Sequence, residues 1–177
     1  GKKSTIINQA NELEIIFRNS MNNEIVIHAR AYNEGVAYCY EILGKGSITV
    51  KQEASTFTIP KGTDAWMQSY VPHYERYYIK RTLDSVTVPP VLRPYEEYYK
   101  SAFSETSYKD DFAFPVLAKL PSGTWIYLTE AATYGTYCGC RLFANAQTNN
   151  TLHILIDSEV TTTLPLITPW RVIMASK

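Results

Sequence analysis

Alternation of apolar and polar residues with a period of two is the dominant pattern of this chain. Residues 47–51 read S-I-T-V-K and residues 56–59 read T-F-T-I, and both runs are rich in β-branched and aromatic side chains. Such side chains fit a pleated sheet, and the alternation places one set on each face of a strand. The pattern predicts a chain built mostly from half-buried β-strands.

The clearest predicted hairpin joins residues 24–32 to residues 36–42. The connection contains Asn33, Glu34 and Gly35, and the glycine is expected to supply a positive φ in the turn. A second hairpin is expected between residues 11–17 and the strand at 24–32, and residues 44–47 are also expected to form a hairpin turn. Local sequence therefore predicts antiparallel pairing at the start of the chain.

Later strands are separated by turn residues at fairly regular spacing. They are predicted at residues 113–120, 124–129, 140–143, 152–156 and 172–175. This spacing predicts an all-β fold, an antiparallel β-sandwich, formed by one domain over residues 1–177. Two segments interrupt the pattern: the proline-rich residues 88–94 are expected to cross the surface, and residues 95–102 are a short helix candidate.

Composition excludes several classes of protein. The 17 basic residues balance the 17 acidic ones, whereas nucleic-acid-binding domains concentrate positive charge on one face. No apolar run approaches the roughly 18 residues of a membrane helix, and the first residues lack the apolar stretch of a signal peptide. A chain of this size can bury roughly 70% of its unfolded surface, so a core forms without disulfides or a structural metal.

The three cysteines do not describe a disulfide framework. Cys138 and Cys140 could be combined with His28, His73 and His153 into a zinc site, but zinc ligand pairs are normally separated by two to four residues. The favoured interpretation is therefore that these cysteines are small buried apolar residues near a glycine turn.

Tyrosines are dense in two stretches of the chain, and this density indicates either a contact surface or ordinary core and rim packing. If it is a contact surface, its partner is another domain or a ligand. The residues are Tyr70, His73, Tyr74, Tyr77, Tyr78, Tyr95, Tyr98 and Tyr99.

Two pairs of adjacent carboxylates are candidates for the acid and base of glycoside hydrolysis. They are Glu96 with Glu97 and Asp110 with Asp111. Adjacent residues of a strand point to opposite faces, so both pairs are interpreted as solvated loop charges.

Glu130 is the most informative single residue. It closes the otherwise apolar or small run W-I-Y-L-T of residues 125–129. The default interpretation is a solvated strand terminus. The alternative is that Glu130 projects towards a cation or a sugar hydroxyl, where a hard cation such as calcium would need several more oxygen ligands.

Four stretches carry a resemblance to a known family. Residues 30–40 (R-A-Y-N-E-G-V-A-Y-C-Y) resemble R-x-Y-N-D-G-x-A-F-R-Y, and residues 53–57 (E-A-S-T-F) are similar to E-x-T-x-F with a one-residue difference. Residues 126–132 and 137–142 are similar to E-A followed by Y-x-G-M-x-L, with one extra residue between the two parts. Residues 168–173 (T-P-W-R-V-I) match the run that closes the domain. In this order, the stretches resemble the N-terminal domain of glycoside hydrolase family 97.

The resemblance implies a galactose-mutarotase-like β-super-sandwich, incomplete at its N-terminus. Members are calcium-dependent exo-acting α-glucosidases or α-galactosidases, mostly of the bacterial envelope, which implies a periplasmic or cell-envelope location. Their catalytic carboxylates lie in a (β/α)₈ barrel that this chain lacks. The resemblance assigns the calcium-binding glutamate of the N-terminal domain to Glu130, because that residue matches the family motif.

Three functions compete at this stage. The first is a non-catalytic accessory domain that packs on a catalytic barrel and lends Glu130 to its calcium site, without holding calcium alone. Without its barrel, such a chain would expose an apolar face including Trp66, Tyr74 or Trp170 and is expected to self-associate. The second is a stand-alone carbohydrate-binding module for α-linked sugars. The third, an enzyme active alone, has the least support, because no acid and base pair can be placed on one face.

Overall fold

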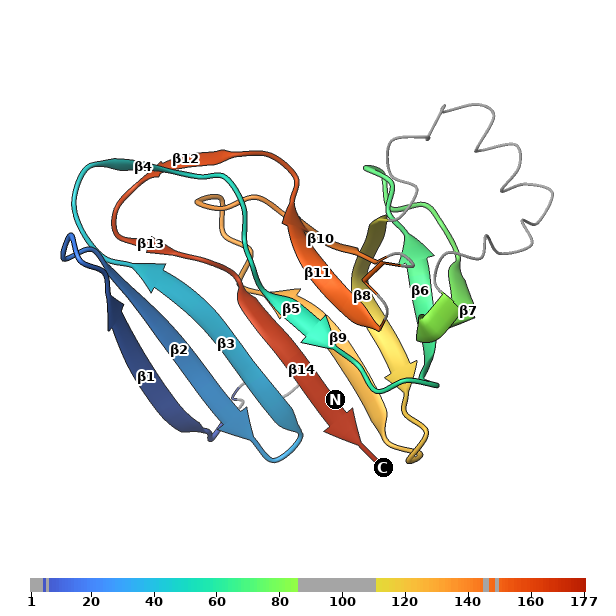
Figure 1. Ribbon diagram of the computed structural model, residues 1–177. Coiled ribbons are helices and arrows are strands. Elements are labelled where there is room, and N and C mark those ends of the chain that lie inside the picture. Colours follow the sequence, from blue (N-terminus) through green and yellow to red (C-terminus); the bar gives the residue numbers. More distant parts are fainter. Residues whose placement is uncertain (1–4, 6, 86–110, 145–146, 149) are drawn as a thin grey trace.

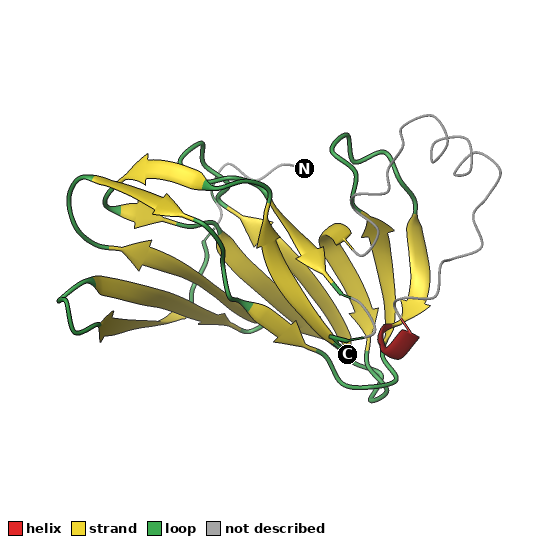
Figure 2. Ribbon diagram, turned by 45° about the horizontal axis from the view of Figure 1, so that its top comes forward, coloured by secondary structure: helices red, strands yellow, loops and turns green. Residues whose placement is uncertain are grey.

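The computed structural model describes residues 5, 7–85, 111–144, 147–148 and 150–177, and the regular secondary structure within them is almost entirely β-strand. The elements are β1 Asn11–Arg18, β2 Glu24–Tyr32, β3 Gly35–Ile42, β4 Ser47–Val50, β5 Thr56–Thr58, β6 Asp64–Ser69, β7 Tyr78–Thr82, the 3₁₀ turn η1 Leu83–Ser85, β8 Asp111–Lys119, β9 Trp125–Ala131, β10 Cys140–Phe143, β11 Thr151–Ile156, β12 Val160–Thr163, β13 Leu166–Ile167 and β14 Trp170–Ser176. Figure 2 shows strands throughout and the one short turn of helix.

One long antiparallel sheet forms most of the domain. Its strand order is β1-β2-β3-β14-β9-β8-β10-β11-β5, with β13 beside β3 and with β6 joining β7 to β8. The sheet curls on itself, so that the β10, β11 and β5 end passes over β14 and β9 (Figure 1). The strands β4 and β12 form a separate two-stranded sheet. The predicted antiparallel β-sandwich is confirmed.

The core lies between the two halves of the curled sheet. Apolar side chains from both halves meet there and are almost fully buried. They include Phe57 of β5, Met67 of β6, Leu128 of β9, Leu142 of β10 and Leu152 of β11. Phe57, Leu142 and Leu152 come from strands whose burial alternates along the chain, which is the outcome expected for sheets with one buried face.

The predicted strands are present with boundaries shifted by at most two residues, while β6, β7, β12 and β13 were not predicted. Two details of the turns were wrong. Residues 44–47 do not form a hairpin turn, because β4 pairs with the distant β12 rather than with β3. Gly35 does not supply a positive φ, since it lies within β3 and pairs with Met174. The helix candidate at 95–102 and the proline-rich segment 88–94 lie outside the described residues.

In the described part of the chain, no helix has the length and apolar character needed to cross a membrane.

Candidate functional site

Arg171 is the centre of the candidate site, and its side chain is fully buried. It lies on β14, where the alternation places Arg171 and Ile173 on the inner face and Trp170 on the outer face beneath Arg30. A buried guanidinium must be neutralised and hydrogen-bonded, because an isolated charge in a low-dielectric interior is very costly. Two carboxylates meet this requirement.

Glu53 binds Arg171 through two parallel hydrogen bonds. The Nε of Arg171 donates to Oε1 at 3.0 Å, and Nη2 donates to Oε2 at 2.6 Å. The glutamate side chain is only 6% exposed and comes from the connection between β4 and β5. This fork-to-fork geometry is the strongest form of an arginine–carboxylate pair. Glu53 is therefore a structural partner whose lone pairs are directed to Arg171.

Glu130 lies directly opposite Arg171 on the neighbouring strand β9. It accepts one hydrogen bond, from Nη1 of Arg171 to Oε2 at 2.7 Å, and its side chain is 13% exposed. Burial raises the pKa of Glu130, and the attraction of Arg171 only partly offsets that effect. Compared with Glu53, this carboxylate is held less completely and lies nearer the surface.

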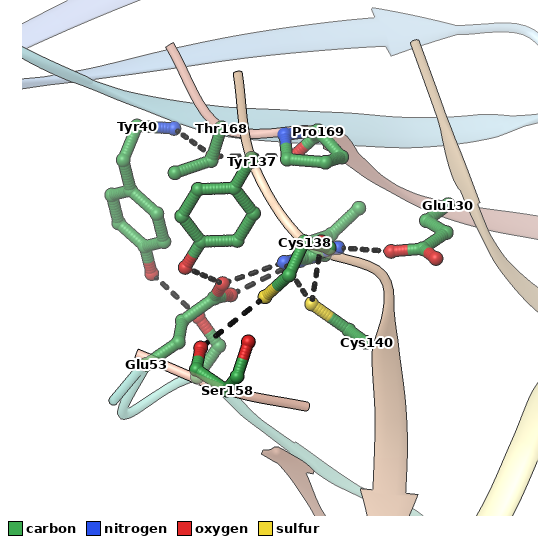
Figure 3. A network of polar contacts seen from close by, with 11 residues as sticks. Tyr40, Glu53, Glu130, Tyr137, Cys138, Cys140, Ser158, Thr168 and Pro169 are labelled. Atoms are coloured by element: carbon green, nitrogen blue, oxygen red, sulfur yellow. Dashed lines mark hydrogen bonds and ion pairs between the residues drawn. The ribbon is translucent and has the colours of Figure 1, made fainter. Parts of the chain in front are cut away.

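Neighbouring polar groups complete the cluster, as Figure 3 shows. Nη2 of Arg171 lies 3.1 Å from the sulfur of Cys140, and the Tyr137 hydroxyl donates to Oε2 of Glu53 at 3.4 Å. Burial raises the pKa of the Cys140 thiol to about 12 and raises that of Tyr137 as well. Burial alone would lower the pKa of Arg171, but its hydrogen bonds to Glu53 and the surrounding charges raise it.

The cluster contains one positive and two negative groups when both glutamates are ionised. An excess negative charge at a buried site attracts a cation, and carboxylate oxygen is the donor that hard divalent cations prefer. Because Glu53 is engaged twice by Arg171, Glu130 is the group with acceptor capacity left to offer. The chemistry available here is the donation of one carboxylate to a cation.

The structure corrects the default interpretation of Glu130 as a solvated strand terminus, because it is a mostly buried residue in an ion pair. Asp111 is likewise not a solvated loop charge, since it lies at the start of β8, is 7% exposed and binds Arg141 at 2.6 Å. Glu96, Glu97 and Asp110 lie outside the described residues.

Glu53 and Arg171 both lie within the family motifs, but the sequence did not predict a role for either residue. For Arg171, the available signal was a single charge within the apolar run of residues 170–175.

The cysteine and histidine residues do not come together. Cys39 and Cys140 are buried, Cys138 is partly exposed, and none is in a disulfide. His28 instead lies between Glu14 at 3.2 Å and Glu41 at 2.8 Å. Among the described residues, no group of three or more His, Cys, Asp or Glu side chains is arranged to hold a metal ion.

The dense tyrosines divide between core and surface. Tyr70 is 8% exposed and belongs to the core, whereas Tyr74, Tyr77 and Tyr78 are 45–52% exposed. Tyr95, Tyr98 and Tyr99 lie outside the described residues.

A cavity of about 500 Å³ lies on the other face of β3 and β14 from Arg171. Its lining combines aromatic and charged side chains with an apolar floor. It includes Arg30, Glu34, Tyr134, Trp170, Val172 and Met174.

The fold and this site define an antiparallel β-sandwich domain with a buried arginine–carboxylate cluster. Comparison with known proteins identifies the family to which this domain belongs. Residues 1–177 match the family described as glycosyl-hydrolase 97 N-terminal. The chain therefore belongs to the N-terminal domain family of glycoside hydrolase family 97, which confirms the resemblance.

One curated relative is a probable retaining alpha-galactosidase of Streptomyces bingchenggensis (strain BCW-1), with 28% identity over 174 residues. The alignment covers 98% of this chain but 24% of the relative, so the chain spans about a quarter of that protein.

Two solved structures share the fold. A β-arabinopyranosidase has a TM-score of 0.74 and 22% identity, covering 94% of this chain and 27% of its own. A family 97 enzyme from Pseudoalteromonas sp. strain K8, in complex with acarbose, has a TM-score of 0.60 and 15% identity, covering 97% and 27%.

Proposed function

We propose that this chain is the non-catalytic accessory β-sandwich of a calcium-dependent α-glycoside hydrolase, which packs on the catalytic barrel and lends Glu130 to the calcium site. The observation that carries the proposal is the unequal engagement of the two buried carboxylates. Glu53 is held by two hydrogen bonds from Arg171, while Glu130 accepts only one from it and lies nearer the surface.

The donor chemistry at Glu130 fits calcium. A carboxylate oxygen is a hard ligand, and the cluster carries a surplus negative charge that a cation would offset. Calcium takes six to eight oxygen ligands, so the remaining ligands would come from the catalytic domain and solvent. A cation bound there would supply electrostatic stabilisation of negative charge on oxygen. Arg171 would keep the Glu130 carboxylate ionised and oriented.

Calcium dependence of the full-length polypeptide tests the proposal. We expect Glu130→Gln to raise the free calcium concentration needed for half-maximal hydrolysis of p-nitrophenyl α-galactoside or α-glucoside by at least about tenfold. The amide keeps the size of the side chain but removes its charge, so packing is preserved. The measurement is initial rate against free calcium in EGTA-buffered solution.

Two matched variants separate calcium binding from folding. The exposed Glu159→Gln should behave as the wild type. Glu53→Gln should lower thermal stability, while the folded fraction keeps its calcium requirement. Identical calcium curves for wild type and Glu130→Gln, or full activity in excess EGTA, would refute a calcium role for Glu130.

The cavity beside Trp170 favours a second candidate, carbohydrate binding by this chain alone. Aromatic side chains with polar neighbours are typical of small-ligand sites, and Tyr134 is 70% exposed on its rim. For this function, isothermal titration of the chain with maltose, galactose or their oligosaccharides should give binding heat. Tyr134→Ala should abolish that heat without changing thermal stability. No heat with any of these sugars would eliminate this candidate.

A further inference from the structure

The loop between β6 and β7 is held in one conformation by a buried glutamine. The side chain of Gln68 is 5% exposed, and its Nε2 donates to the carbonyl oxygens of Tyr74 at 2.7 Å and Arg76 at 2.8 Å. A backbone hydrogen bond from Tyr74 to Val71 at 2.9 Å closes the turn. A buried amide that uses both of its hydrogens on one loop fixes the path of that loop.

Tyr74 occupies an unusual conformation at the tip of this loop. Its φ is 58°, in the left-handed region that bulky residues rarely adopt and that asparagine or glycine would adopt more easily. The ring is nevertheless 46% exposed, so it does not fill the core. Burial therefore gives no reason for an aromatic residue at this position, and strain of this kind is concentrated at functional sites.

A rigid base supports the Tyr74 ring. Its centroid lies 5.7 Å from that of the buried Tyr70, and the two planes meet edge to face at 82°. The Tyr70 ring also contacts Arg141, whose guanidinium carbon lies 5.3 Å from the ring centroid. Ion pairs with Asp111 at 2.6 Å and Asp157 at 2.7 Å hold this arginine in place. The Tyr74 ring is thus pre-oriented before any ligand arrives.

The same contacts connect Tyr74 to the Glu130 cluster. Arg141 directly follows Cys140, whose sulfur lies 3.1 Å from Nη2 of Arg171, and Arg171 in turn donates to Glu130. Burial raises the pKa of the Tyr74 hydroxyl, and the negative charges of Glu130 and Asp157 raise it further. Through Tyr70, Arg141 and Cys140, the Tyr74 ring is thus connected to the Arg171–Glu130 pair.

We propose that Tyr74 is a specificity-determining residue that contacts the pyranose ring of the α-glycoside bound beside the Glu130 site. A tyrosine suits this ligand because its ring packs on the C–H face of a sugar, its hydroxyl bonds a sugar hydroxyl, and it loses little conformational entropy. The proposal rests on the proposed function, since the sugar itself would be held mainly by the catalytic domain.

The test measures KM and kcat of the full-length polypeptide with p-nitrophenyl α-galactoside and α-glucoside. Tyr74→Ala and Tyr74→Asn are expected to raise KM for the preferred substrate by about tenfold, whereas Tyr74→Phe keeps most of the affinity because it retains the ring. The calcium concentration for half-maximal activity should not change. Tyr74→Asn should also raise the thermal midpoint of the protein, since asparagine adopts the left-handed conformation more easily. Tyr127→Ala is the matched control, since it removes a ring that is 37% exposed on β9 and lies outside both candidate sites.

Several results would overturn the proposal. Unchanged KM in Tyr74→Ala and Tyr74→Asn overturns it and leaves the role of Glu130 intact. A rise in KM that follows an equal rise in calcium requirement shows that Tyr74 acts through the cation and not on the sugar. If a Tyr74 variant lowers kcat and the two domains of the full-length polypeptide then melt in separate transitions, Tyr74 contacts the catalytic domain and not the sugar. Absence of any α-glycosidase activity in the wild-type polypeptide overturns the proposed function together with this inference.

Discussion

Replacement of Arg171 by methionine is expected to lower the free energy of unfolding by about 3–5 kcal/mol. The substitution keeps an unbranched side chain of similar length but leaves Glu53 and Glu130 without the cation that neutralises them. Both carboxylates are largely buried, so each must then be protonated or drawn towards water. Urea-induced unfolding of the chain, followed by tryptophan fluorescence, gives the measurement.

Two controls identify the cause of this loss. Arg18→Met removes an arginine that is 63% exposed and pairs with Glu24 at the surface, so it should cost less than about 1 kcal/mol. Adding Glu53→Leu and Glu130→Gln to Arg171→Met should recover much of the stability, because no buried charge then lacks a partner. A loss in Arg171→Met no larger than in Arg18→Met would show that the cluster contributes little to folding.

The strands could be predicted because their signal is local. The two β-rich runs, residues 24–32 and 36–42, are separated by only three residues. So short a connection forces adjacent antiparallel pairing, as β2 and β3 show. β6 and β7 were not predicted because their local signal is weak. Asp64–Ser69 contains consecutive buried residues rather than clean alternation, and its pairing with β8 is interrupted by a bulge between Trp66 and Gln68.

Pairing between distant segments left no comparable signal. The pairing of β4 with β12 joins residues more than a hundred positions apart, and the turn residues at 44–47 do not indicate which strand β4 pairs with. Sheet partners of this kind are chosen by the packing of the whole core, which a local pattern does not contain.

The candidate site was only partly predictable for a related reason. Glu53 and Arg171 are 118 positions apart, and Glu130 and Arg171 are 41 apart. Sequence shows that Arg171 interrupts an apolar run and that Glu130 borders one, which marks both as unusual, but it does not show which opposite charge either residue meets. The family motif pointed to Glu130 by position. The structure adds that Glu130 is opposite Arg171 across β9 and β14, so its ionisation depends on that pair.

Gly35→Ala is expected to destabilise the domain by about 1–3 kcal/mol or more, because it inserts a methyl group where backbone already lies. A Cβ at this position would be 2.2 Å from the carbonyl oxygen of Ile173 and 2.7 Å from the Cα of Met174. Neither atom belongs to a flexible side chain, so β3 and β14 would have to separate locally. Thermal and urea unfolding of the variant, compared with the wild type, measure the effect.

Gly139→Ala is the matched control, since a Cβ there meets no atom within 4 Å and the backbone is not in the left-handed region. This substitution should leave the free energy of unfolding unchanged or raise it by a few tenths of a kcal/mol, because alanine lowers the conformational entropy of the unfolded chain. Equal stability of the two variants would mean that β3 and β14 are not as close at Gly35 as the structure places them. The comparison also bears on the site, because the β3–β14 register that pairs Gly35 with Met174 pairs Tyr38 with Arg171. A shift of that register would change the β3 neighbour of Arg171, whereas the pairing of Arg171 with Glu130 is set by β14 and β9 and should be retained.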